Sequence, residues 1–155
     1  MQAIIKHSHA GGLEIAREKE LYDWTIEAFN CSTIVWQKGA GKLVRNHIQK
    51  RLLHDGWSNE FNISNSYDLK IMGQKNGVIM QLQTGNISRV PYDFLKFQYL
   101  FTERRVEMAI YCLPTAKGAY ACGPSSNIAQ IERISSELKL FHRIITIPIF
   151  LVGFE

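Results

Sequence analysis

The chain has 155 residues, of which 46% are apolar and 21% are charged, as in an ordinary globular protein, and its length predicts a single domain over 1–155. Its net charge of +4 is compatible with a nucleic-acid partner and with many other partners. Three cysteines without a CxxC pair exclude a structural zinc site, and their odd number, with no secretion signal and no long apolar run, indicates reduced thiols in a cytoplasm.

The first half of the chain is predicted to begin with helices and continue with strands. Apolar residues recur at helical spacing after the Gly11-Gly12 break, and a second amphipathic pattern ends at Gly56. The predicted helices cover 13–29 and 41–54, and the predicted strands cover about 60–64, 67–72 and 77–84. A turn at 73–77 is expected to join the last two strands as a hairpin.

The second half alternates helices and strands. A helix over 93–104 is opened by Pro91, and the apolar run 106–113 is a buried-strand candidate. The segment Pro124–Asn127 is interpreted as a loop with a helix N-cap, leading into a helix that ends near Leu140. A last strand is predicted over 147–154. This order of elements predicts an α/β or α+β domain, with a central mixed sheet flanked by helices.

Polar side chains on the predicted hairpin suggest a metal-dependent nuclease site. Asp68 lies on its first strand, and Gln81 and Gln83 share one face of its second strand. Facing side chains of neighbouring strands lie about 5 Å apart, so two such strands can hold one Mg²⁺ ion beside a phosphate. The alternative is an ordinary strand-edge aspartate beside two solvated glutamines.

Five segments, in the right order, resemble a known family of nucleases. They are similar to the opening motif, the catalytic segment, the following helix start and two later strands of BglII/BstYI-type type II restriction endonucleases. The segments are His7–Glu14, Ile79–Asn86, Tyr92–Phe97, Val106–Pro114 and Ile147–Gly153.

The resemblance implies the PD-(D/E)XK nuclease fold and Mg²⁺-dependent cleavage of double-stranded DNA. By this likeness Asp68 is the metal-binding aspartate, Gln81 occupies the metal-binding glutamate position, and Gln83 takes the place of the usual lysine. It also implies a prokaryotic restriction–modification protein of the cytoplasm. Such a protein acts as a homodimer on a short palindrome, which several relatives centre on GATC.

Gln81 departs from the family pattern, because an amide carries no charge for the metal. One explanation is an engineered Glu→Gln change that traps uncut DNA. The other is a natural residue, in a protein that uses another acid, such as Glu14, or that binds its site without cutting. A Gln81→Glu variant is expected to be a Mg²⁺-dependent nuclease. A small soluble domain with an unrelated partner remains a further alternative.

Candidate DNA-contacting residues follow the catalytic strand and occupy a later loop. Asn and Gln pair well with adenine, and Arg with guanine, in the major groove. The candidates are Asn86, Arg89, Ser125, Ser126 and Asn127, with Lys42 as a phosphate contact. For each of them a turn, helix-cap or solvent-exposed role is the alternative. His7 and His9 would share one face of a strand, where a structural or DNA-contact role is favoured over metal binding.

Overall fold

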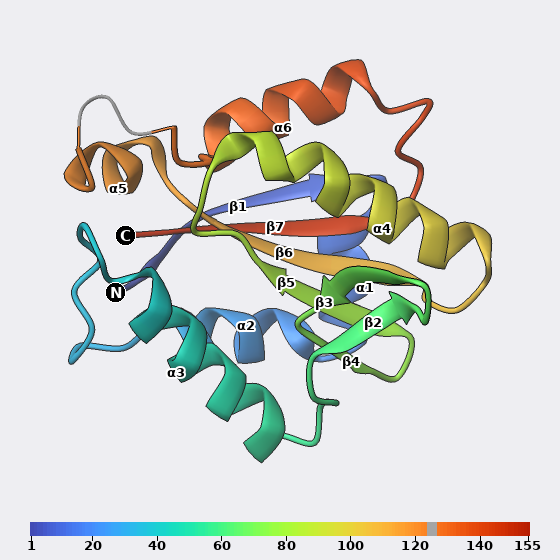
Figure 1. Cartoon of the computed structure of the whole chain (residues 1–155), viewed down its shortest axis with the longest axis horizontal. Coiled ribbons are helices and arrows are strands. Elements are labelled where there is room, and N and C mark those ends of the chain that lie inside the picture. Colours follow the sequence, from blue (N-terminus) through green and yellow to red (C-terminus); the bar gives the residue numbers. More distant parts are fainter. Residues whose placement is uncertain (124–126) are drawn as a thin grey trace.

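The computed structural model describes residues 1–123 and 127–155. Its centre is a five-stranded mixed sheet in the order β1-β7-β6-β5-β4 (Figure 1). The inner strands β5, β6 and β7 run parallel, and β1 and β4 are antiparallel edge strands. These strands are β1 (Ala3–His9), β4 (Gly73–Lys75), β5 (Val78–Leu82), β6 (Met108–Pro114) and β7 (Ile149–Phe154).

Helices cover both faces of this sheet. In the orientation of Figure 1, α2 and α3 lie below the sheet and α4 and α6 lie above it. The alternation of buried side chains along the strands separates two apolar clusters, one against α1–α3 and one against α4 and α6. The helices are α1 (Gly12–Glu18), α2 (Leu21–Phe29), α3 (Gly41–His54), α4 (Val90–Thr102), α5 (Ala116–Ala121) and α6 (Ile131–Leu140). No described helix is long and apolar enough to cross a membrane.

The helices agree with the sequence pattern except at one break. α3 has the predicted bounds, and α4 begins three residues earlier than predicted, with Pro91 in its first turn. The predicted helix 13–29 is divided into α1 and α2, because Glu20 between them adopts a left-handed backbone with φ +58°. α6 begins only at Ile131 and is preceded by Gln130, so Asn127 is not its N-cap.

The predicted hairpin between 67–72 and 77–84 does not form. Its predicted first strand becomes β3 (Tyr67–Ile71), which pairs with β2 (Phe61–Ser64) in a separate two-stranded sheet. The segment predicted as the turn contains β4, which pairs with β5, so the chain divides between β3 and β4. The division occurs at Met72, whose backbone N–H donates to a side chain of β5 instead of a backbone carbonyl. The edge strand β1, which pairs with β7, was not predicted from the sequence.

Candidate functional site

Gln81 and Gln83 lie at the carboxyl end of β5 and face α4. Both side chains are buried, at 7% exposure each. The side-chain oxygen of Gln81 accepts from Met72 N at 3.0 Å, and that of Gln83 accepts from Gly85 N at 2.9 Å. Each carbonyl oxygen therefore already has a backbone partner, and each amide nitrogen is left to donate elsewhere.

Both amide nitrogens donate to Asp93, in the first turn of α4. Asp93 Oδ1 accepts from Gln81 Nε2 at 3.2 Å and pairs with Lys96 Nζ at 2.7 Å. Its Oδ2 accepts from Gln83 Nε2 at 3.0 Å and from the Tyr111 hydroxyl at 2.7 Å. We call these five side chains the Asp93 network. It is a buried polar centre in an otherwise apolar layer.

Burial and the charge of Asp93 both raise the pKa of Tyr111, the fifth member of the Asp93 network. Burial of Tyr111 on β6 raises the pKa of its hydroxyl well above the ordinary value, and the negative charge of Asp93 raises this pKa further. The hydroxyl therefore stays protonated and donates to the carboxylate. Phe94 and Phe97 pack against the Tyr111 ring edge to face, at 5.8 and 5.2 Å between centroids.

Asp68 lies away from this network. It is on β3 with 79% of its side chain exposed, and its carboxylate pairs with Lys70 Nζ at 3.2 Å. The β4–β5 ladder ends at the pair Gly73 and Met80, and beyond it Met72 meets Gln81 through its backbone N–H, while its side chain packs in the cluster against α1–α3. Asp68 lies four residues before Met72, about 13 Å of extended chain. The expected facing pair of Asp68 and Gln81 is therefore absent, because the strand carrying Asp68 has left the main sheet.

Glu14 is also separated from the Asp93 network. It lies on α1, which packs on the opposite face of the sheet. The Ser8 hydroxyl donates to its carboxylate at 2.5 Å, and this hydrogen bond lowers the pKa of Glu14. The structure thus places the two expected acids, Asp68 and Glu14, apart from Gln81.

The donor set around Gln81 does not suit a divalent metal ion. A carboxylate offers about four lone-pair sites, and Asp93 already accepts from four donors, one of them an ammonium. The side-chain oxygen of Gln81 is taken up by Met72 N. Among the described residues, no group of three or more His, Cys, Asp and Glu side chains could hold a metal. His9, the candidate strand histidine, has Nε2 2.7 Å from the carbonyl of Ile145, a structural contact.

Several predicted DNA contacts gather beyond the carboxyl end of β5. Exposed Asn86 and Arg89 bracket the short helix η1 (Ile87–Arg89), and Asn86 Oδ1 caps it by accepting from Ser88 N at 2.9 Å. Exposed Asn127 lies beside them, because its carbonyl accepts from Ile87 N at 2.7 Å. The other predicted residues of that loop, Ser125 and Ser126, lie outside the described residues.

Lys42 approaches the same edge from α3. It is exposed in the first turn of that helix, directly after Gly41. A Cβ on Gly41 would lie 3.1 Å from the hydroxyl of Thr84, which follows β5. The structure therefore brings a basic side chain, two amides and the arginine to one end of the sheet. We call Lys42, Asn86, Arg89 and Asn127 the β5-end surface.

The sequence prediction missed three members of the Asp93 network, although one signal was available. Asp93, Lys96 and Leu100 are three and four residues apart, so they lie on the same side of the predicted helix, one in each successive turn. A charged pair on the apolar side of a helix indicates a buried ion pair. Tyr111 gave no comparable signal, because it stands in a continuous apolar strand.

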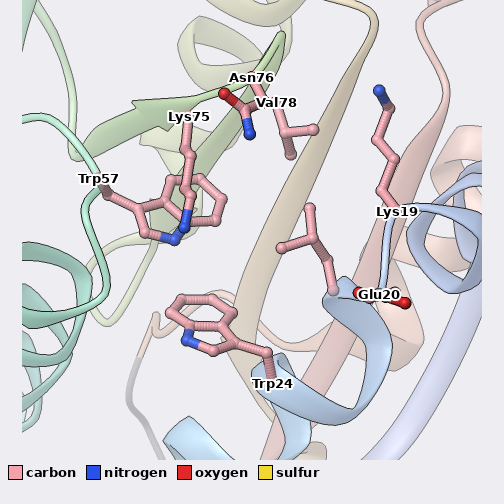
Figure 2. A pocket seen from close by; sticks show the side chains of 8 residues that line it. Lys19, Glu20, Trp24, Trp57, Lys75, Asn76 and Val78 are labelled. Atoms are coloured by element: carbon pink, nitrogen blue, oxygen red, sulfur yellow. The ribbon is translucent and has the colours of Figure 1, made fainter.

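A separate hollow lies near the β4–β5 turn. Figure 2 shows Trp24 and Trp57 on one side of it and Lys19 and Glu20 on another, and its volume is about 420 Å³. The indole rings are stacked at 5.1 Å, and Trp24 Nε1 donates to Asp55 at 2.7 Å. Lys19 is paired with Glu107 at 2.6 Å. The hollow thus lies at a junction of helices and turn, and both of its lysines have partners within the protein, since Lys75 donates to the carbonyl of Asp55 at 2.6 Å.

Known proteins match the chain in family and fold. The family described as restriction endonuclease BglII/BglIII matches residues 4–154. The crystal structure of restriction endonuclease BglII complexed with a DNA 16-mer superposes with a TM-score of 0.78 at 16% identity, over 100% of this chain and 78% of that one. Free BglII gives a TM-score of 0.74 at 16% identity, over 100% and 80%. No curated protein sequence matches the chain.

Proposed function

Because the chain belongs to the BglII/BglIII family of restriction endonucleases, we propose that it recognises a short specific site in double-stranded DNA and that, with its present residues, it holds this site without Mg²⁺-dependent cleavage. The observation that supports the absence of Mg²⁺-dependent cleavage is the Asp93 network. The only carboxylate in it is saturated by four donors, and what meets Gln81 from the chain before β4 is the backbone N–H of Met72, not a second acid.

The proposed DNA contacts are those of the β5-end surface. Asn86 and Asn127 present amides suited to adenine, and Arg89 a guanidinium suited to guanine. Lys42 supplies a charge for a phosphate. The crystal structure of BglII complexed with a DNA 16-mer supports DNA as the partner. We further propose a prokaryotic cytoplasmic protein acting as a homodimer on a palindrome, with a GATC centre as the first sequence to test, since a two-fold protein matches a two-fold site.

The test is selection of binding duplexes from a random library, followed by binding assays with EDTA and with Mg²⁺. We expect specific binding in both and intact DNA in both. Arg89→Ala is expected to weaken specific binding by about 1–3 kcal/mol and to relax the preference at one base pair. Lys42→Ala is expected to reduce the salt slope by about one. Lys139→Ala, an exposed lysine on α6, is the matched control and should change neither quantity.

Mg²⁺-dependent site-specific cleavage is the second candidate, and the family itself favours it. Cleavage of the selected duplex by the unaltered protein with Mg²⁺ or Mn²⁺ would establish it and overturn the first proposal. Gln81→Glu sharpens the comparison, because it places a second carboxylate beside Asp93, where the Gln81 nitrogen now lies 3.2 Å away. If the second candidate is right, this variant gains Mg²⁺-dependent cleavage; under the first proposal it leaves DNA intact, because Lys96 still neutralises Asp93 and no second acid is present. If it binds the site and leaves DNA intact with either metal, position 81 is not a metal position.

The surroundings of Gln81 also bear on its origin. An engineered trapping change would replace one carboxylate and leave the acid across from it in place. Here the chain next to Gln81 offers the backbone N–H of Met72 instead, and the buried Met72 side chain lies in the cluster against α1–α3. This arrangement supports a natural residue at position 81 rather than a single engineered substitution.

A further inference from the structure

Lys96 is the one cation in the Asp93 network, and it is held on two sides. Its side chain is only 10% exposed. Its ammonium lies 2.7 Å from Asp93 Oδ1 and donates to the backbone carbonyl of Lys70, also at 2.7 Å. Lys96 thus joins the beginning of α4 to β3, the strand that pairs with β2 outside the main sheet.

These two contacts are of the kind that a divalent cation makes in proteins. Hard cations bind carboxylate and backbone carbonyl oxygens, and here an ammonium binds one of each. An ammonium is a compact positive charge with three donors, so it neutralises Asp93 without an ion from solution. The remaining donors to Asp93 are neutral, which leaves a buried centre with balanced charge.

The Asp93 network is connected to the proposed DNA contacts. Asp93 fixes the amide of Gln83, whose oxygen accepts from Gly85 N at 2.9 Å. The Gly85 carbonyl in turn accepts from Ala129 N at 3.0 Å, so this residue ties the loop of Asn86 to the segment of Asn127. Three hydrogen bonds therefore link Asp93 to the backbone beside Asn86 and Asn127 of the β5-end surface.

We propose that the Lys96 ammonium stands in for a divalent metal ion: it holds Asp93, and through it Gln83 and the β5-end surface, in a DNA-binding arrangement that needs no divalent cation. The consequence for DNA rests on the proposed function. The substitution of a metal by Lys96 is a property of the protein alone and is tested without DNA.

The experiment compares the unaltered protein with Lys96→Met, which keeps the length of the side chain and removes the charge. Thermal unfolding is followed in EDTA and in millimolar Mg²⁺ or Mn²⁺. We expect the unaltered protein to have the same Tm in all three solutions. Lys96→Met is expected to have a lower Tm in EDTA and to regain at least about 3 °C with a divalent cation, because the free Asp93 carboxylate then binds it.

Two control variants separate metal binding from general loosening. Lys75→Met removes an ammonium that donates to a backbone carbonyl, that of Asp55 at 2.6 Å, and it should lose stability without any gain from metal. The double variant Asp93→Asn/Lys96→Met removes both charges. It is expected to fold better than Lys96→Met and to gain nothing from metal.

Without DNA, two outcomes overturn the inference: a Tm of the unaltered protein that rises with divalent cations, or a Lys96→Met protein that no divalent cation stabilises. With the selected duplex, binding that requires Mg²⁺ overturns it as well. If the unaltered protein binds no DNA in any solution, the proposed function fails, and the result with Lys96→Met still decides the role of the ammonium.

Discussion

Two aspartate–lysine pairs in this protein use the same chemistry in opposite surroundings. Asp93 and Lys96 on α4 are 2.7 Å apart, with 4% and 10% of their side chains exposed. Asp68 and Lys70 on β3 are 3.2 Å apart, with 79% and 48% exposed. Water screens the second pair, whereas the first must be neutralised within the protein. The role of each aspartate therefore depends on its burial and its neighbours in space, and not on how near it lies to Gln81 in the sequence.

The two pairs also differ in what else they hold. Asp93 collects hydrogen bonds from β5 and β6 and so joins a helix to the sheet. Asp68 contacts only the neighbouring Lys70 among the ion pairs of the described residues, on a two-stranded sheet outside the main one. Removing Asp93 should therefore affect the whole domain, and removing Asp68 only one exposed edge.

The largest effect is expected for Asp93→Ala. It leaves the Lys96 ammonium buried without its carboxylate and leaves three hydrogen-bond donors unpaired. We expect a loss of about 3–5 kcal/mol in the free energy of unfolding. Urea denaturation measures this, and a loss below about 1 kcal/mol would contradict the assignment of Asp93 as the centre of the network.

Tyr111→Phe removes one hydrogen-bond donor to the buried Asp93 and nearly keeps the volume of the side chain. It removes the hydroxyl that donates to Asp93 Oδ2 at 2.7 Å and keeps the ring between Phe94 and Phe97. We expect a loss of about 1–3 kcal/mol in urea denaturation. Tyr67→Phe, on an exposed ring of β3, is the control and should leave the midpoint unchanged.

Asp55 offers an intermediate case, with its pKa lowered from 3.8 to about 2 by the hydrogen bond from Trp24 and then by that from His54. A folded-state pKa below the ordinary value means that the carboxylate stabilises the fold above about pH 4, and that this contribution is lost as the pH falls toward 2. Trp24→Phe should raise the Asp55 pKa, as an NMR titration of its carboxyl carbon would show. A titration midpoint still near 2 in that variant would exclude the indole as the main cause.

The smallest effect is expected for Asp68→Ala, the exposed counterpart of Asp93→Ala. Its partner Lys70 stays solvated, so the free energy of unfolding should change by less than about 0.5 kcal/mol, and by less still in molar salt. A larger loss in urea denaturation would mean that the exposed pair holds β3 in place. Loss of specific DNA binding would instead give Asp68 the functional role that the resemblance implies.

Much of the fold follows from local patterns in the sequence. The amphipathic spacing around Val44, Ile48 and Leu52 predicts α3, and the apolar runs predict β6 and β7 within two residues. The order of these elements along the chain predicts the mixed sheet between helices. These features depend on side chains close together in the sequence, where periodicity carries the information.

The site was less predictable because it depends on strand pairing. Nothing local to Met72 indicates that its N–H turns to the side chain of Gln81, and this choice separates Asp68 from β5. The Asp93 network likewise joins β5, β6 and α4, three elements whose register is set by long-range packing. Gln81 and Gln83 were correctly expected to share one face of a strand, and their partner acid was not foreseen.

The stacked indoles of Trp24 and Trp57 give this molecule an internal optical reporter. Two indoles with centroids 5.1 Å apart and nearly parallel planes couple their electronic transitions, so together they give a circular dichroism signal that neither gives alone. They lie on the α1–α3 side, and the third tryptophan, Trp36, packs on that side too. Tyr111 lies on the other side. Loss of the coupled indole signal on heating therefore reports the melting of the α1–α3 face of the sheet.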